Sequence, residues 1–265
     1  RGGTLVITRS NQFVLGSSKS FYDGTIVRSN ATLQLLVSAN NNSLDIREWL
    51  ILEQGSTLRI TETNAAWMGW RWNGVVDFRG DAVVDVSADG FTLNNDAGYL
   101  MGSGRLIKAG NGELSLHEHS PEFTGDVEIQ DGRVNFSGIS QFSLPNAGTV
   151  YLGMADTTDR GEVSFAVRSE RDEMASVINV TQPFVVRGNS SGTRIGFMRQ
   201  NHNDVANFTG DIDLSGFDTG TSFRELQLYM NDETMSQRKA ADAADVAEEA
   251  FLKFSGDISG GDKRI

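Results

Sequence analysis

A short motif of the form Phe-x-Gly-Asp occurs four times, and this repetition constrains the fold more than any other feature of the chain. The copies begin at Phe78, Phe123, Phe208 and Phe254, which are 45, 85 and 46 residues apart. Self-similarity at such spacing is typical of repeat architectures. The middle distance is nearly twice the others, so the sequence predicts a unit of about 45 residues that contains two solenoid coils of roughly 22 residues each. We expect each Phe to point inward and each Gly-Asp pair to turn the chain at a corner.

Short runs in which every second residue is apolar dominate the rest of the chain, for example at 4–7, 32–35, 56–60 and 127–129. This alternation is the period of a β-strand. Gly, Asn or Asp separates the runs about every eight to twelve residues. The rhythm alone fits a sandwich, a barrel or a solenoid, and the repeat favours a single continuous parallel β-solenoid over residues 1–265. The side chains predicted to point inward are Leu106, Leu114, Leu116, Val127, Ile129, Val134 and Phe136.

Residues 233–253 break this pattern, because they contain no Gly or Pro. An apolar stripe recurs there at spacings of four and three residues, at Ala240, Ala244, Ala247, Phe251 and Phe254. Thr234 followed by Gln237 resembles a capping box. We therefore expect one amphipathic helix over 233–253, inserted into the solenoid near its C-terminal end as a packing element.

The charge balance excludes several classes of partner. The net charge is -12 and the pI is about 4.7, so the chain has no basic face for nucleic acid or for an anionic membrane surface. No apolar run approaches the ~20 residues of a membrane-spanning helix. The chain has no cysteine, so repetition and burial must replace disulfides if it is secreted. Its first residues already follow the strand pattern, and we expect a mature fragment or a processed part of a longer protein.

A resemblance to a known family rests on residues 102–136. The segment matches a pattern G-x-G-x-L-x-K-x-G-x-G-x-L-x-L, then an aromatic-[ST]-G motif, a strand, and x-G-x-L-x-V. The matching residues are Gly102, Gly104, Leu106, Lys108, Gly110, Gly112, Leu114, Leu116, Phe123, Gly125 and Gly132. This segment resembles the passenger-associated transport repeat of autotransporters, and it departs from the family at Asp126, where Gly is frequent.

The resemblance implies a right-handed parallel β-helix, export across a bacterial outer membrane, and a location outside the cell or on its surface. It also implies a passive stem that carries recognition regions. The glycines would permit sharp bends at corners. We expect Lys108 to lie on a strand and to face solvent.

Three of the four tryptophans lie within six residues, at Trp67, Trp70 and Trp72, beside Arg71. Exposed aromatic side chains next to a guanidinium could bind glycans or a protein partner on a host or neighbouring cell. A thick local core or an end cap explains the same residues, and the sequence leaves both interpretations open. If the chain contains a binding site, we expect it at these four residues.

Other motifs have simple structural explanations. Arg79-Gly80-Asp81 is an integrin-type tripeptide, but its Gly-Asp belongs to the repeated corner. His117 and His119 share one face of an extended segment, whereas a metal site needs three or four ligands and His202 is distant. We therefore expect no metal and no cofactor.

Paired carboxylates keep an enzymatic alternative open. Asp126 with Glu128, and Asp211 with Asp213, would each share one strand face, as in a polysaccharide lyase or hydrolase. Such pairs are also typical of solvated faces, so we expect no catalytic centre. The sequence thus predicts a non-catalytic adhesive or structural stem. The alternatives are a subunit of an extracellular filament or surface layer, with homotypic self-association, and a polysaccharide-active enzyme on the same fold.

Overall fold

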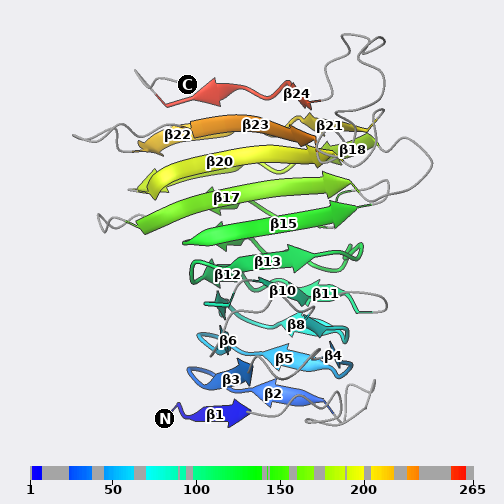
Figure 1. Ribbon diagram of the computed structural model, residues 1–265, viewed down its shortest axis with the longest axis vertical. Helices are drawn as coiled ribbons and strands as arrows, with labels where there is room; N and C mark the ends of the chain where they lie inside the picture. The colour runs from blue at the N-terminus through cyan, green and yellow to red at the C-terminus, as the bar shows by residue number, and fades with distance from the viewer. Residues whose placement is uncertain are drawn as a thin grey trace, which may run out of the picture.

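The chain is described by a computed structural model that stacks parallel β-strands into a solenoid (Figure 1). The described residues are 2–7, 24–37, 45–62, 70–88, 90–93, 98–138, 142, 144–154, 160–169, 177–188, 190–199, 204–217, 226–232 and 252–260. Every strand pair among them is parallel, and none of these residues is helical. None of these segments forms a helix that could cross a membrane.

Two long sheets form most of the solenoid. Sheet A contains β1 (Thr4–Ile7), β3 (Thr32–Val37), β6 (Thr57–Glu62), β9 (Ala82–Val86), β12 (Leu106–Ala109), β14 (Val127–Ile129), β16 (Val150–Leu152), β19 (Phe184–Gly188), β22 (Ile212–Phe217) and β25 (Ile258–Ser259). Sheet C contains β4 (Asp45–Ile46), β7 (Arg71–Trp72), β10 (Gly90–Leu93), β13 (Glu113–Leu116), β15 (Gly132–Gly138), β17 (Arg160–Ser169), β20 (Ser190–Arg199) and β23 (Leu226–Asp232). The strands of sheet C lengthen toward the C-terminal half (Figure 1).

Two shorter sheets complete the coils. Sheet B contains β2 (Thr25–Val27), β5 (Leu50–Leu52), β8 (Val76–Phe78) and β11 (Leu100–Gly102), and sheet D contains β18 (Val177–Val180), β21 (Val205–Phe208) and β24 (Leu252–Phe254). In a complete coil the chain visits sheet A, then sheet C, then sheet B or D, as in β9, β10 and β11 before β12. The prediction of parallel strands stacked into coils is therefore confirmed.

The core follows the predicted alternation. Leu106, Leu114, Leu116, Val127, Ile129, Val134 and Phe136 are all buried, as predicted. Aromatic rings stack inside this core along the axis. Phe78 contacts Phe123 edge to face at 5.5 Å between ring centroids, and Phe208 stacks on Phe254 at 4.8 Å. The four phenylalanines of the repeat therefore occupy equivalent positions, each four residues before a strand of sheet A.

The predicted unit of two coils is correct in one interval and wrong in two. Phe78 and Phe123 are two coils apart, because Gly102 pairs with both. Phe208 pairs directly with Phe254, so their spacing is a single coil, in which Asp211 and Asp257 are 46 residues apart. Three steps of sheet A separate Phe123 from Phe208, through β16 and β19. The motif marks one corner of the solenoid, whereas the loops between the sheets set the length of each coil.

The predicted helix over 233–253 is wrong at its C-terminal end. Leu252–Phe254 form strand β24, which pairs with β21. Backbone pairing and the stacking of Phe254 on Phe208 outweigh the local helical stripe there. Residues 233–251 lie outside the described part of the chain.

The aromatic stack predicts a large loss of stability on truncation. Phe123→Ala and Phe208→Ala should each lower the free energy of unfolding by about 3–5 kcal/mol, because a buried ring leaves a cavity. Val177→Ala is the control, since Val177 is 48% exposed, and it should cost far less. Denaturant titration measures the difference. A loss below about 1 kcal/mol for either phenylalanine would contradict the alignment of the repeat.

Candidate functional site

The acidic residue of the Phe-x-Gly-Asp motif joins successive coils. Asp81 accepts a hydrogen bond from the backbone N–H of Arg105 at 3.0 Å, 24 residues later. Asp126 accepts one from Thr149 at 2.9 Å, and Asp211 accepts one from Asp257 at 2.8 Å. Each carboxylate therefore replaces a backbone acceptor at the corner where sheet A begins. This role explains Asp126, at which the sequence departs from the family pattern.

The glycine of the motif is required because successive coils approach closely. A Cβ atom at Gly125 would lie 2.0 Å from the carbonyl oxygen of Gly104, and one at Gly256 would lie 2.1 Å from that of Gly210. The Arg-Gly-Asp tripeptide lies in this column. Its Arg79 side chain pairs with Asp77 at 2.8 Å. Coil stacking thus accounts for both Gly80 and Asp81.

The two carboxylate pairs considered as catalytic candidates have structural partners. Glu128 forms an ion pair with Arg105 at 2.9 Å and accepts a hydrogen bond from the Gln130 amide at 2.8 Å. Asp126 lies 3.6 Å from the same guanidinium. Asp213 accepts a hydrogen bond from the backbone N–H of Ser215, which lowers the pKa of the Asp213 carboxyl. Neither pair therefore resembles a general acid beside a free base.

A stack of long side chains covers sheet A beside these carboxylates, and the sequence analysis did not identify it. The guanidinium of Arg187 lies 3.7 Å from the ring centroid of Tyr151, and that of Arg105 lies 5.3 Å from the same centroid. Glu128 and Tyr151 are register partners on β14 and β16. Charge pairs separated by one coil, such as Arg59 with Asp85, are the sequence signal that would reveal such stacks.

Lys108 corrects one prediction. The side chain was expected to face solvent, but it is fully buried and points into the corner that follows β12. Its Nζ donates hydrogen bonds to the carbonyl oxygens of Ala109, Gly110 and Asp131, at 2.9, 2.5 and 3.0 Å. Gly110 adopts a φ of 75°, which favours glycine. The ammonium thus satisfies carbonyl groups of one sharp corner and of the next coil.

Burial also changes the titration of this lysine. Removal from water lowers the pKa of Lys108 to about 8, and the charges of Asp131, Asp85 and Glu113 oppose this effect in part. A buried ammonium carries a solvation cost that its three carbonyl partners offset. Lysine is the residue type that reaches these carbonyls from a core-facing strand position, since its aliphatic stem packs among apolar side chains.

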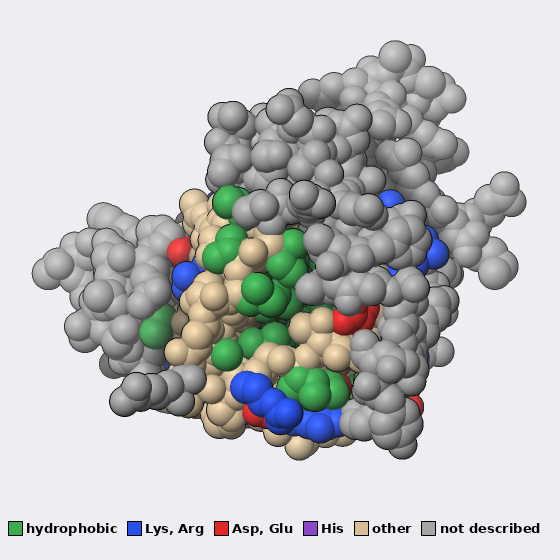
Figure 2. Space-filling view, turned by 90° about the horizontal axis from the view of Figure 1, so that it is seen from below, with side chains coloured by type: hydrophobic (Ala, Val, Ile, Leu, Met, Phe, Trp, Pro, Cys, Tyr) green, Lys and Arg blue, Asp and Glu red, His purple; other side chains and the backbone are tan. Residues whose placement is uncertain are grey.

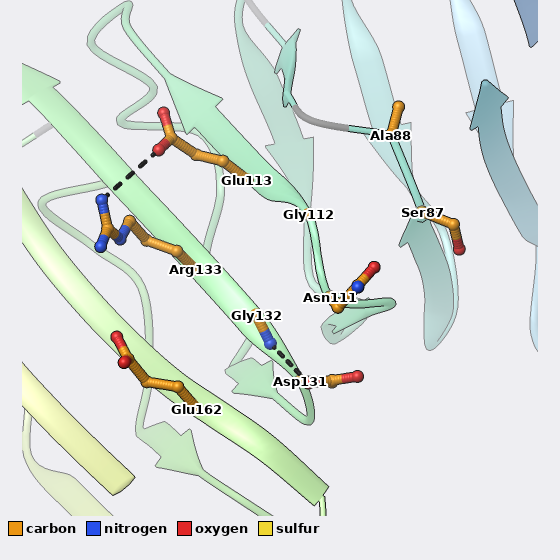
Figure 3. Close-up of a pocket in the computed structure, with 9 residues that line it drawn as sticks. All are labelled: Ser87, Ala88, Asn111, Gly112, Glu113, Asp131, Gly132, Arg133 and Glu162. Atoms are coloured by element: carbon orange, nitrogen blue, oxygen red, sulfur yellow. Dashed lines mark hydrogen bonds and ion pairs between the residues drawn. The ribbon is translucent and has the colours of Figure 1, made fainter. Parts of the chain in front are cut away.

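A pocket of about 390 Å³ opens at the corner between sheets A and C (Figure 3). Its lining residues are Ser87, Ala88, Asn111, Gly112, Glu113, Asp131, Gly132, Arg133 and Glu162. Arg133 lies 3.7 Å from Glu113, and Asp131 accepts a hydrogen bond from the N–H of Gly132. Because Ala88, Gly112 and Gly132 carry little or no side chain, the corner is hollow. The pocket offers carboxylate, amide and hydroxyl groups to a polar ligand.

The tryptophan cluster belongs to the core where it is described. Trp70 and Trp72 are 3% and 0% exposed, and the Trp72 indole donates a hydrogen bond to the carbonyl oxygen of Glu48 at 2.7 Å. Arg71 lies between them on β7, half-buried. Of the two interpretations that the sequence leaves open, burial supports a local core for Trp70 and Trp72, because both rings fill the interior beside sheet C. Trp67 lies outside the described residues.

Within the described part of the chain, the histidine pair gains no third ligand. His117 is half-buried and His119 is exposed, while His202 lies outside the described residues. Among the residues that the structure describes, no group of three or more histidine, aspartate or glutamate side chains could hold a metal ion.

Glu48 is a buried carboxyl that sequence reasoning missed. The side chain is 1% exposed, its Oε1 accepts a hydrogen bond from the hydroxyl of Thr25, and its Oε2 has no partner. Burial raises the pKa of Glu48, and the bond from Thr25 opposes this effect in part. A buried carboxylate with an unsatisfied oxygen destabilises the fold when it is ionised.

Lys108 predicts a pH-dependent stability. Its folded pKa of about 8 lies below the ordinary value of 10.5, so between these values the unfolded chain binds more protons. The free energy of unfolding should therefore rise with pH across this window, by roughly 3 kcal/mol from this group. Below pH 8 the cost of the buried charge is fully present. The Lys108→Met variant should lose this rise, whereas Lys253→Met, at an exposed position, should keep it.

Denaturant titrations from pH 7 to pH 11 give the free energy of unfolding of wild type and of each variant. Subtracting one from the other removes the contribution of all other titrating groups. If the free energy of unfolding changed with pH in the same way for wild type and Lys108→Met, the prediction of a buried Lys108 ammonium with a lowered pKa would be wrong.

Glu48 predicts the opposite pattern at low pH. Its folded pKa is raised, so the carboxyl contributes stability below its ordinary value of 4.5 and loses it as the pH rises through the folded pKa. Glu48→Gln should therefore raise the melting temperature at pH 7 and leave it nearly unchanged at pH 4. Asp213→Asn, whose pKa is shifted down, is the control and should not stabilise at pH 7. A lower melting temperature for Glu48→Gln at pH 7 would show that the ionised carboxylate has a favourable partner.

Comparisons of the chain with protein-family models, with curated proteins and with solved structures give no match. The likeness to the passenger-associated transport repeat therefore depends on the motif residues at 102–136 alone.

Proposed function

We propose that this chain is a non-catalytic stem of an extracellular or cell-surface protein of the autotransporter type, built as a right-handed parallel β-helix. Right-handed crossovers are the rule for parallel strands that return to the same sheet. In this function the chain holds recognition regions away from the cell and presents its own lateral surface. Glycans or proteins of a host or neighbouring cell are the partners that such a surface would meet.

The observation that carries the proposal is the use of the motif residues. Lys108 and the motif aspartates bind backbone groups of the next coil, and the motif glycines allow those coils to approach. The residues that form the sequence motif are thus used to join successive coils of the solenoid. A sequence selected for catalysis would instead leave polar groups converging on an open pocket.

The pocket between sheets A and C supports a second candidate, a polysaccharide-active enzyme. Glu113 and Glu162 line the same hollow and project from β13 and β17, the strands on either side of β15 in sheet C (Figure 3). Paired carboxyls that flank a sugar are the usual machinery of glycoside hydrolysis. Both side chains are engaged by arginines, Glu113 with Arg133 and Glu162 with Arg194 at 2.9 Å, which favours a structural role.

An array of bacterial and host polysaccharides, assayed for both binding and cleavage, tests the proposal. We expect no cleavage by the wild-type chain, and therefore no difference from the double variant Glu113→Gln/Glu162→Gln or from Asp126→Asn/Glu128→Gln. Glu53→Gln is the control for a general loss of surface charge, since Glu53 pairs with Arg28 and belongs to none of the candidate pairs.

Cleavage that one of these double variants or Asp211→Asn/Asp213→Asn abolishes, while Glu53→Gln retains it, would overturn the proposal of a non-catalytic chain. Export is tested separately, on the full-length gene product. A membrane-embedded translocator domain that follows this chain would support the autotransporter assignment, and a full-length product without one would contradict it.

A further inference from the structure

The pocket of about 390 Å³ at the corner between sheets A and C contains polar groups that the fold does not use. Its volume lies within the range of small-molecule sites, which is roughly 300–1,000 Å³. Asp131 and Arg133 flank Gly132 along the chain, and Gly132 lies against Gly112 of the preceding coil (Figure 3). A ligand that lies over the two glycines therefore meets polar side chains on either side of them. Figure 2 views the molecule from below, toward its N-terminal end, so the pocket is followed in Figure 3.

The guanidinium of Arg133 is the first of these groups. It approaches the carboxylate of Glu113 only to 3.7 Å. By contrast, the guanidinium of Arg194 lies 2.9 Å from the carboxylate of Glu162 and donates a hydrogen bond to it. A separation of 3.7 Å is too long for a hydrogen bond. Within the described part of the chain, the N–H groups of the Arg133 guanidinium therefore remain available to a ligand.

The carboxylate of Asp131 is the second group. One of its oxygens accepts a hydrogen bond from the backbone N–H of Gly132 at 2.9 Å. The ammonium of Lys108 binds the backbone carbonyl oxygen of Asp131, so it does not occupy the carboxylate. No ion pair joins Asp131 to an arginine or lysine of the described residues. A half-buried carboxylate of this kind is a strong acceptor for a cationic donor.

Two buried polar atoms beside Arg133 have no partner. Asn135 follows Arg133 by two residues on the same face of β15, and Ser164 is the register partner of Arg133 on β17. They are 2% and 0% exposed, and neither Asn135 Oδ1 nor Ser164 Oγ takes part in a hydrogen bond. Since buried polar atoms are nearly always hydrogen-bonded, these two mark a place where a partner is missing. A hydroxyl-bearing ligand that extends from the pocket over β15 would supply it.

We propose that this pocket binds an amino sugar, which is a saccharide unit with a free ammonium group. The ammonium pairs with Asp131. The ring hydroxyl groups accept hydrogen bonds from Arg133 and donate them to Glu162, because a hydroxyl group is both donor and acceptor. The inference rests on the proposed function, in which the lateral surface meets glycans, and it names the class of glycan.

The spacing and the charges of the pocket both favour this ligand. Glu113 and Glu162 project from β13 and β17, which are two strand steps or roughly 9–10 Å apart, so the carboxylates surround a molecule larger than an ion. Glu113 and Glu162 each face an arginine, whereas Asp131 does not. The charge that awaits a partner is therefore negative. An acidic sugar would reach Arg133 only beside the carboxylate of Glu113.

Isothermal titration calorimetry on the isolated chain tests the inference with three probes. They are an oligosaccharide of β-1,4-linked glucosamine, the same oligosaccharide with every amine acetylated, and the linear amine spermidine. The buffer is at pH 5.5, where the free amines carry a proton. We expect the glucosamine oligosaccharide to bind at least about tenfold more tightly than either of the others, because only this probe offers both the ammonium and the hydroxyl groups.

Variants of the pocket connect the binding to its residues. Asp131→Asn keeps the shape of the side chain and removes its charge, so it should weaken binding of the glucosamine oligosaccharide about tenfold or more. Asn111→Trp, at an exposed position of the lining, should fill the hollow and abolish binding. Glu53→Gln is the matched control, since Glu53 pairs with Arg28 at another corner, and it should bind like wild type. Melting temperatures show that each variant is folded.

The remaining outcomes each overturn a different statement. Equal binding of the acetylated oligosaccharide or of spermidine, unchanged binding by Asp131→Asn, or no binding by wild type would overturn the amino-sugar site and would leave the stem function standing. Cleavage of the bound oligosaccharide would instead overturn the non-catalytic stem, while the ligand class of the pocket would stand.

Discussion

The structure depends on the close approach of backbone to backbone between successive coils. Parallel strands pair from one coil to the next over the whole described chain, and the corners must be equally tight for that pairing to continue. At the corner before sheet A the distance is so short that a side chain at Gly104 or Gly125 would overlap the carbonyl group below it. The glycines therefore determine where the chain can turn, and the aspartates that follow them supply the acceptor that the turn removes from the ladder.

At the corner that follows β12, an ammonium group rather than a carboxylate binds the backbone groups that the turn leaves unpaired. After β12 the chain turns through Gly110 with a positive φ, and several carbonyl oxygens converge there. Lys108 satisfies them from inside the core. An ammonium has three donors and no acceptor, so it suits a place where only carbonyl oxygens lie within reach. The cost is a buried charge, which makes this corner sensitive to pH, whereas the motif aspartates are half-buried or exposed.

The fold was predictable from the sequence because the alternation of apolar residues and the repeated motif each involve many residues along the chain. Seven core residues between Leu106 and Phe136 were identified correctly from strand period alone. The failures occurred where a side chain's direction depends on a neighbouring coil. Lys108 lies at an inward position of an alternating strand, but its charge suggested solvent. For Trp70 and Trp72 the sequence left a local core and an exposed surface open, and the choice depends on the neighbouring coil, in which the carbonyl oxygen of Glu48 accepts the hydrogen bond of the Trp72 indole. The pocket lined by Glu113 and Glu162 was not predictable, since it requires the small residues of three successive coils, Ala88, Gly112 and Gly132, to meet at one corner.

Coils of different length fit the same solenoid, and this affects where its sequence can vary during evolution. The coil between Asp126 and Thr149 takes 23 residues, and that between Asp211 and Asp257 takes 46, yet both close with the same carboxylate bond at the same corner. The corner aspartates therefore fix the register of the strands, and this register does not depend on the length of the loops between them. Insertions, deletions and exchanged segments at these intervals leave the ladders intact. Sequence variation should consequently accumulate in the loops, while the residues at the corners stay constant.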